Sequence, residues 1–199
     1  MFESNLFRPL ARIFFVLLSL YSGQSWSLCE NLMFRALQEL DLDIPSTFSY
    51  DRADWGEVYV PGAITTRRKI LEDRSRAPIV LREGKSSVKF GFWHDYYFPE
   101  THLKAWEVEV DHIVPLKNAH DNGAAFWSAE KKLQFATDPE NLVVTKKEYN
   151  RLKGPKGIDE WLPVDKRYAC RYVKNWMKIK KKYSLIITKQ EMEAVAQLA

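Results

Sequence analysis

Residues 109–116 read EVDHIVPL, and this stretch decides how the middle of the chain folds. Apolar and polar residues alternate over 105–110, which is typical of a β-strand with one buried face. The pair Asp111 and His112 follows at the end of that strand, before a short apolar run that Pro115 stops. Taken alone, such a pair is more often structural than reactive, so its function depends on what the rest of the sequence places beside it.

The sequence downstream predicts a second strand and then a helix. NLVVT at 141–145 reads as a short apolar strand, and TKKEYNRLKG at 145–154 reads as a short helix. Strand, loop, strand and helix form a ββα arrangement whose two ends can meet. We therefore expect Asp111 and His112 to face Asn150 on the helix.

These residue types suit a metal-dependent hydrolytic site. The Asp111 carboxylate and the Asn150 carbonyl are hard oxygen ligands, which suit Mg²⁺-like cations better than zinc. A histidine beside such a cation can stay neutral and deprotonate water, because its unperturbed pKa is about 6.5. Two protein ligands leave coordination positions open for water and for a phosphate oxygen.

The flanking sequence predicts a β-hairpin and further helices. IVLR at 79–82 and SVKFGFW at 87–93 flank a turn and read as the hairpin. We expect helices over 65–76 and over 118–138, the second with Ser128 as an N-cap residue.

Two short patterns predict where later helices begin. Thr145 and Glu148 have the spacing of a capping box, and TKQE at 188–191 has the same spacing ahead of a C-terminal helix. In the last third of the chain, aromatic and aliphatic residues recur at helical spacing and predict one buried stripe: Tyr168, Tyr172, Trp176, Ile179 and Tyr183.

Composition places the chain among ordinary globular proteins. Its 199 residues suit one domain with its own core, and 28% charged residues with 46% hydrophobic ones exclude a disordered polymer and a multi-span membrane protein. The net charge of +4 does not by itself require a nucleic-acid partner. The segment from Arg171 to Lys182 contains six basic residues and no acid. Such a run most often forms a solvated face of a helix.

Residues 1–27 are predicted to be a secretory signal peptide. Two arginines precede the apolar run IFFVLLSLY at 13–21, which is too short to span a bilayer comfortably, and small polar residues follow it. An uncleaved anchor is the alternative, because Trp26 is an unusual neighbour of a cleavage site. We expect residues 28–199 to form the mature domain.

Cys29 and Cys170 are the only cysteines in the chain. In an exported protein they can pair in a disulfide that ties the mature N-terminus to the C-terminal third, and two unpaired thiols are the alternative. The sequence has no CxxC pattern or zinc-finger spacing, which argues against a structural zinc site.

Three blocks of the sequence, DHIVPL (111–116), DPENLVV (138–144) and NRLKG (150–154), resemble the motifs of HNH, or ββα-metal, endonucleases. The resemblance extends to secreted nucleases of the GmrSD C-terminal-domain type and covers most of residues 50–183. The stretches that carry it are YDRADWG (50–56), TRRKIL (66–71), GFWHDYY (91–97), GAAFWSAEKKLQFATDPENL (123–142), NRLKGPKGIDEWLP (150–163) and YACRYV (168–173).

The resemblance implies an α+β fold with a ββα-metal core, a β-hairpin and additional helices. It also implies roles for four residues of the motif. His112 resembles the general base, Asp111 and Asn150 resemble the metal ligands, and Asn141 resembles the residue that braces the loop and orients the base. Asn150 stands where other members of the superfamily carry His, and Asn ligation is well represented there.

Three basic residues are candidates for contact with the substrate. Arg67 belongs to the Thr-Arg pair of the resemblance, and its guanidinium could clamp the scissile phosphate. An ion pair between Arg67 and an acid within 51–54 is an equally good interpretation. Arg151 and Lys153 flank Asn150 and are expected to bind phosphate, with a solvated helix charge as the alternative.

The sequence departs from the secreted relatives at two places. Those relatives usually have Gly-Cys-Asp before the Thr-Arg pair, whereas 63–65 read AIT here, so the usual partner of Cys170 is missing. That Cys29 replaces it is a hypothesis. His120 stands where relatives tend to have Trp, and it is therefore not assigned a catalytic role.

The expectation is an exported, metal-dependent HNH endonuclease that hydrolyses DNA, with RNA left open as a second substrate. It would use one divalent cation, most simply Mg²⁺ with Mn²⁺ as another candidate. It would act as a monomer in the periplasm or outside the cell, without stable membrane association after processing. The alternative is a non-catalytic exported module that keeps the ββα fold and holds nucleic acid through its basic C-terminal helix.

Overall fold

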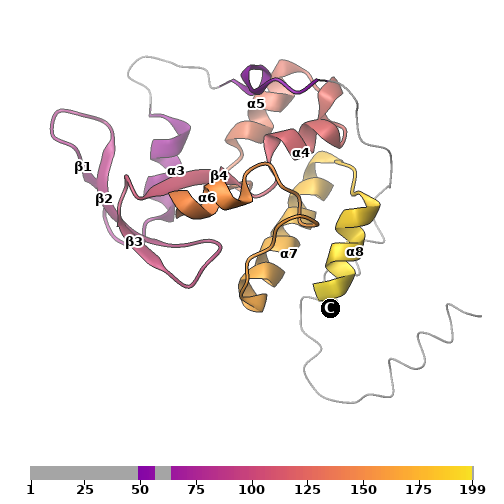
Figure 1. Ribbon diagram of the computed structural model, residues 1–199. Coiled ribbons are helices and arrows are strands. Elements are labelled where there is room, and N and C mark those ends of the chain that lie inside the picture. The colour runs from indigo at the N-terminus through magenta and orange to yellow at the C-terminus, as the bar shows by residue number, and fades with distance from the viewer. Residues whose placement is uncertain (1–48, 57–63, 199) are drawn as a thin grey trace, which may run out of the picture.

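The computed structural model describes residues 49–56 and 64–198, and this part of the chain is an α+β protein with two small antiparallel sheets (Figure 1). The α+β class expected from the sequence is confirmed. The elements in chain order are η1 (Arg52–Trp55), α3 (Thr66–Arg74), β1 (Val80–Leu81), β2 (Val88–His94), β3 (Thr101–Lys104), β4 (Val108–His112), α4 (Leu116–Asp121), η2 (Ala124–Phe126), α5 (Ala129–Thr137), β5 (Leu142–Lys146), α6 (Lys147–Lys153), α7 (Lys166–Tyr183) and α8 (Lys189–Leu198).

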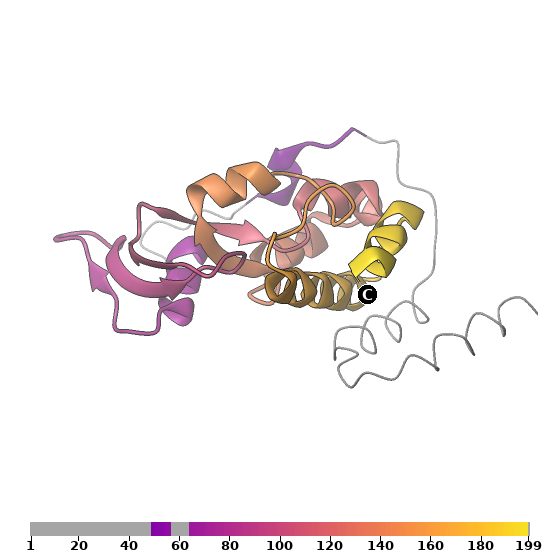
Figure 2. The same cartoon turned by 60° about the horizontal axis from the view of Figure 1, so that its bottom comes forward.

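The first sheet has the order β1-β2-β3, with both pairs antiparallel. The hairpin expected from 79–93 is confirmed as β1 and β2, whereas β3 was not anticipated. Helix α3 is attached to this sheet because the Trp93 indole donates to the carbonyl of Leu71 at 2.7 Å. Thr65 caps α3 by accepting from the Arg68 N–H at 3.2 Å. Figure 2 shows the sheet at one end of the molecule, away from α7 and α8.

The second sheet pairs β4 with β5 in antiparallel register, so that Asp111 lies opposite Val143 and His112 opposite Leu142. The expected strand began at 105, but β4 begins at Val108 because a turn precedes it, closed by the Glu107 N–H donating to a β3 carbonyl at 3.0 Å. Helix α6 follows β5 directly. The expected order of strand, strand and helix is therefore confirmed.

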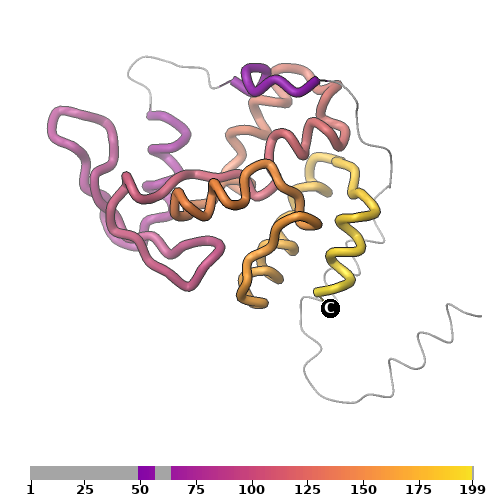
Figure 3. Tube along the Cα trace, in the orientation of Figure 1, coloured from indigo at the N-terminus to yellow at the C-terminus, as the bar shows by residue number. Residues whose placement is uncertain are grey.

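The single helix expected over 118–138 is wrong. The chain forms α4, η2 and α5 instead, and the break falls at Gly123, whose φ of 114° is a conformation that residues with a side chain rarely adopt. Ser128 does cap α5, accepting from the Lys131 N–H at 3.2 Å. Figure 3 shows η1 lying over this helical segment, where the rings of Trp55 and Phe135 pack 5.7 Å apart.

The Thr145 capping box is also wrong, because the Thr145 hydroxyl donates to the buried Asp95 carboxylate at 3.0 Å and Lys146 takes the N-cap position of α6. The second box is confirmed. Thr188 and Glu191 exchange hydrogen bonds of 3.0 and 3.1 Å across the start of α8.

Helix α7 supplies the main core. Four of the five residues in its predicted stripe are buried, and Tyr168 is half-buried at the end of the stripe. The stripe packs against α4, α5 and β5, and the rings of Tyr183 and Phe135 lie 4.8 Å apart.

Several predictions lie outside the described residues. The signal peptide over 1–27, its cleavage and Cys29 belong to them, so the disulfide stays a prediction. Cys170 on α7 is half-buried and forms no disulfide within the described residues. No helix in the same part of the chain is long and apolar enough to cross a membrane.

Candidate active site between β4 and α6

Helix α6 runs alongside β4 in the same direction, and three hydrogen bonds join them from end to end. The first N–H of α6 donates to the carbonyl of Glu107 at 3.0 Å. The Asn150 side-chain amide donates to the Glu109 carboxylate at 2.9 Å. At the far end, the Lys153 ammonium donates to the carbonyl of His112 at 2.8 Å. The residues that the sequence separates by about 40 positions are thus brought together.

Strand alternation decides which side chains of β4 face the helix. Glu109 and Asp111 share one face of the strand and point toward α6, as their contacts with Asn150 and Lys153 show. His112 belongs to the opposite face and contacts α5. Two neighbouring residues therefore present their side chains on two sides of the same strand end.

Asp111 is 8% exposed and is held by two donors. Its Oδ2 accepts from the Tyr97 hydroxyl at 2.6 Å and lies 2.9 Å from the Lys153 ammonium, which is 0% exposed. Burial, followed by the charge of Asp111, raises the Tyr97 pKa well above its usual value, so this phenol keeps its proton and donates it to the carboxylate. Lys153 supplies the positive charge that a buried carboxylate requires.

His112 is half-buried, and its Nε2 lies 2.9 Å from the carbonyl of Ala136 at the end of α5. A carbonyl can only accept, so Nε2 carries the hydrogen in the neutral ring and Nδ1 is left unprotonated. Burial lowers the pKa of His112, and the hydrogen bond to Ala136 opposes this in part. The ring is therefore assigned as a neutral imidazole with Nδ1 as the proton acceptor.

Asn141 is fully buried and holds the loop that follows His112. Its side-chain oxygen accepts from the Val114 N–H at 2.9 Å, and its amide donates to the Val114 carbonyl at 3.2 Å. Its backbone carbonyl accepts from the Ile113 N–H at 2.8 Å. Three bonds thus fix residues 113 and 114 relative to the 138–141 loop.

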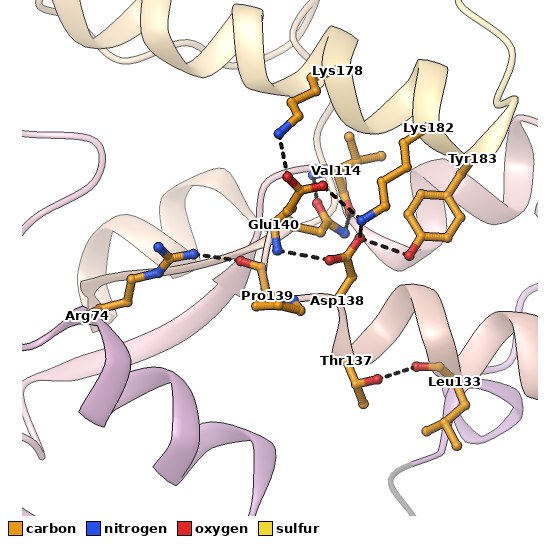
Figure 4. A network of polar contacts seen from close by, with 11 residues as sticks. Arg74, Val114, Leu133, Thr137, Asp138, Pro139, Glu140, Lys178, Lys182 and Tyr183 are labelled. Atoms are coloured by element: carbon orange, nitrogen blue, oxygen red, sulfur yellow. Dashed lines mark hydrogen bonds and ion pairs between the residues drawn. The ribbon is translucent and has the colours of Figure 1, made fainter.

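That loop is itself anchored to α7 (Figure 4). Asp138 accepts from the Lys182 ammonium at 2.7 Å and from the Tyr183 hydroxyl at 2.8 Å. Glu140 binds Lys182 at 2.8 Å and also binds Lys178. These two lysines lower the Glu140 pKa to about 2. We call this set of contacts the loop anchor, and sequence reasoning missed it because its partners lie about 40 residues apart.

The loop anchor accounts for part of the basic run on α7. A third member of the run, Lys180, is fully buried, and its ammonium binds the Glu191 carboxylate of α8 at 2.5 and 2.7 Å. A fourth, Arg171, packs over the Tyr96 ring at 4.7 Å and donates to the carbonyl of the same residue. At least four of the six basic residues are therefore occupied within the protein.

Arg67 lies at the other end of β4 from His112. Its Nη2 donates to the carbonyls of Ala105 and Val108 at 2.8 and 3.0 Å. It forms no ion pair with an acid of 51–54, the alternative left open by the sequence. Burial lowers the pKa of Arg67, and the nearby Glu109 charge opposes this. Arg67 thus stands beside the Glu109 end of the site.

Arg151 and Lys153, the two basic residues close to Asn150, do not share a surface position. Arg151 is exposed, whereas Lys153 points inward to Asp111 and is sealed from solvent. Lys153 therefore neutralises Asp111 in this structure, and its contact with a phosphate stays a prediction. Lys153 lies three residues after Asn150 and therefore on the same face of α6, which is the face turned toward β4. This spacing is the signal from which its buried position could have been predicted.

The oxygen donors of this face are suited to a hard divalent cation. Glu109 adds a third oxygen-bearing side chain to Asp111 and Asn150. Sequence reasoning missed it, although it lies two residues before Asp111 on the same strand face. Because the Asn150 amide nitrogen donates to Glu109, its carbonyl oxygen remains available as a ligand. Within residues 49–56 and 64–198 there is no group of three or more His, Cys, Asp or Glu arranged for a metal, so such a cation would depend on the amide oxygen.

Residues 62–198 match the family model of the C-terminal domain of GmrSD restriction endonucleases. An uncharacterized secreted protein of Arthroderma benhamiae (strain ATCC MYA-4681 / CBS 112371) is 32% identical over 143 residues, which cover 71% of this chain and 69% of that protein. No solved structure gives a significant match. The family match spans more than half of the chain and includes every candidate site residue. The chain therefore belongs to the family of the C-terminal domain of GmrSD restriction endonucleases, which indicates a nuclease domain.

Proposed function

We propose that the protein is an exported, metal-dependent HNH endonuclease that hydrolyses phosphodiester bonds of DNA. The observation that supports this most is the arrangement of β4 and α6. At the end of the strand a neutral imidazole lies on one side and the Asp111 carboxylate on the other, and Asn150 and Glu109 follow on the Asp111 side toward the start of the strand. A scissile phosphate at this end would have a proton acceptor on one side and, on the other, the candidate cation site formed by Asp111, Asn150 and Glu109, which we call the cation seat.

His112 is the proposed general base. Nδ1 removes a proton from a water molecule, and the oxygen attacks the phosphorus while the bond to the 3′ oxygen breaks. The leaving oxygen gains a proton, so the products are a 3′ hydroxyl and a 5′ phosphate. Asn141 and the carbonyl of Ala136 keep the ring oriented during this step.

Asp111 and Asn150, with Glu109 beside them, would hold the divalent cation, most simply Mg²⁺. When bound, such a cation stabilises the negative charge of the transition state and of the departing oxygen. Arg67 has one of its nitrogens bound to backbone carbonyls, and its other nitrogens are proposed to contact the substrate phosphate.

Export is part of the proposal. It is supported by the signal-peptide pattern of residues 1–27 and by the description of the Arthroderma benhamiae relative as secreted. If it is correct, expression in a host with the matching secretion machinery should release a protein whose N-terminal sequence starts near Leu28.

The test of catalysis compares His112→Ala with His94→Ala, a matched control at an exposed histidine of β2. With Mg²⁺ present, the first variant should lose at least about 100-fold in plasmid nicking, the typical contribution of a general base, and the control should not. EDTA should abolish cleavage by the wild type, and added Mg²⁺ or Mn²⁺ should restore it. Cleavage by His112→Ala at the wild-type rate would refute the assignment.

The same experiment tests the non-catalytic alternative. A binding module would retain nucleic acid in EDTA and cleave neither plasmid nor RNA with any added metal. No observation favours this function, because the α7 basic run on which it depends is largely occupied by contacts within the protein.

A further inference from the structure

Trp106 is a large aromatic side chain that is exposed on a turn whose backbone is held by hydrogen bonds. It is 43% exposed, in the turn between β3 and β4. Arg67 binds the carbonyls of Ala105 and Val108 on either side of it, and the N–H of Glu107 closes the turn. An indole on a fixed backbone loses little further conformational freedom when a ligand stacks on it, which favours binding.

A second ring and two ammonium groups surround the indole. The Phe90 and Trp106 rings lie 5.7 Å apart at an angle of 57°. The Lys89 ammonium lies 5.2 Å from the Phe90 ring, and the Lys104 ammonium lies 5.8 Å from the Trp106 ring. We call these four residues the aromatic platform. Lys104 also pairs with the Glu107 carboxylate at 3.0 Å, but this ion pair is open to solvent and contributes little, so a phosphate can replace it. Aromatic faces interleaved with cations are the arrangement that holds single-stranded nucleic acid, since bases stack and phosphates pair with the cations.

The charge of the surrounding hairpin matches a polyanion. Residues 76–90 contain four basic residues and one acid, and all four basic residues are exposed: Arg76, Arg82, Lys85 and Lys89. The hairpin projects at the end of the molecule opposite α7 and α8 (Figures 1 and 2). A neutral or basic partner surface would not need this excess, whereas a phosphate backbone is matched by it.

The platform adjoins the candidate active site. Trp106 lies three residues before Glu109, and Arg67 contacts the backbone on both sides of Trp106 while it lies beside Glu109. Strand β4 spans four residue steps, about 13 Å, from this end to His112. A nucleic-acid strand bound at His112 could therefore continue along β4 and reach the indole.

We infer that the aromatic platform binds an unpaired base of the substrate strand, with Trp106 as the stacking surface and Lys89 and Lys104 as contacts to the flanking phosphates. This rests on the proposed function and deepens it, because it names the form of nucleic acid that the site prefers. Single-stranded or locally opened DNA binds more tightly than intact duplex, since a paired base cannot leave its own stack without a cost.

The test is equilibrium binding of a fluorescein-labelled 20-nucleotide single strand to the full chain, carried out in EDTA and in a His112→Ala background so that cleavage is absent. Removing a stacking contact of about 1–3 kcal/mol predicts that Trp106→Ala raises Kd by roughly 5- to 150-fold. Trp106→Phe should recover most of the affinity. The control is Phe126→Ala, an aromatic residue that is 75% exposed on η2 and should leave Kd unchanged.

A second measurement tests the lysines. Replacing Lys89 and Lys104 by alanine should reduce the slope of log Kd against log salt by about 1.4, the value for two phosphate contacts on a single strand. Unchanged Kd for Trp106→Ala, equal affinity for duplex and single strand, or no binding of the oligonucleotide would each overturn the platform. Cleavage of plasmid by the wild type without these effects refutes the platform and leaves the nuclease proposal standing. If the oligonucleotide binds as predicted but the wild type cleaves no plasmid, the nuclease proposal is refuted and the platform stands.

Discussion

Replacing Lys153 by methionine tests the part of the site that the structure describes most sharply. The ammonium is 0% exposed and lies 2.9 Å from Asp111 and 2.8 Å from the carbonyl of His112. Methionine keeps much of the volume of the side chain but leaves the buried carboxylate with the Tyr97 hydroxyl as its remaining donor. Breaking a buried ion pair by removing one partner costs about 3–5 kcal/mol.

Urea unfolding measures this cost. With a slope of about 2 kcal/mol per molar, the midpoint should fall by roughly 1.5 to 2.5 M. The control is Lys156→Met, because Lys156 is an exposed lysine whose ammonium donates to a carbonyl of α6, and it should change stability by less than about 0.5 kcal/mol. Adding Asp111→Asn to Lys153→Met should return at least about 1 kcal/mol, since the uncompensated charge is then gone.

The same variant also tests the cation seat. Without its ammonium partner, the Asp111 carboxylate is free to be neutralised by a divalent cation. Mg²⁺ at ten times the variant's dissociation constant should therefore stabilise Lys153→Met by about 1.4 kcal/mol, and it should stabilise the wild type by less at the same concentration. A loss of stability below 1 kcal/mol for Lys153→Met would refute the reasoning that Lys153 neutralises a buried charge.

Two further variants test the support of the loop after His112. Asn141→Ala removes two side-chain bonds to Val114 and leaves a buried N–H and carbonyl unpaired, so we expect a loss of about 2–4 kcal/mol in urea unfolding and a fall in kcat with little change in KM. Glu140→Gln tests the loop anchor through pH. The pKa of Glu140 is about 2 when folded and higher when unfolded, so its contribution to stability is present above about pH 4.5 and is lost as the pH falls toward 2. Because Glu140 is exposed, we expect its contacts to contribute less than about 1 kcal/mol to the free energy of unfolding. In Glu140→Gln the unfolding midpoint should therefore fall less steeply with decreasing pH than in the wild type. An unchanged acid dependence would contradict the loop anchor.

Local patterns predicted the elements of the site because each signal lies within a few residues. Alternation at 105–110 and the apolar run at 141–145 predicted two strands, and both are present with shifted ends. The TKQE box predicted the start of α8 because both partners lie in one helical turn.

Two failures share one cause, which is a distant partner that local pattern cannot see, whereas the break in the helix expected over 118–138 comes from Gly123 itself. Thr145 has the spacing of a capping residue, but the buried Asp95 carboxylate lies 50 positions earlier and takes its hydroxyl. Asp95 also accepts from the Lys146 N–H at 2.7 Å, so it fixes the end of β5 directly. The inward position of Lys153 likewise depends on Asp111, about 40 positions before it. Charge in a sequence does not show which side of an element is covered.

The basic residues of the chain differ in which of them are bound within the protein and which are exposed. The run on α7 is the densest positive segment of the chain, yet Lys178 and Lys182 bind acids of the loop that carries Asn141. Asn141 holds residues 113 and 114, so we propose that the two lysines support the orientation of His112 and do not bind substrate. The charges open to a polyanion instead lie on the β1–β2 hairpin, where the sequence is less basic but its lysines and arginines are exposed. Substrate affinity and the orientation of the base are therefore assigned to opposite ends of the molecule, and variants at the two ends should separate Kd from kcat.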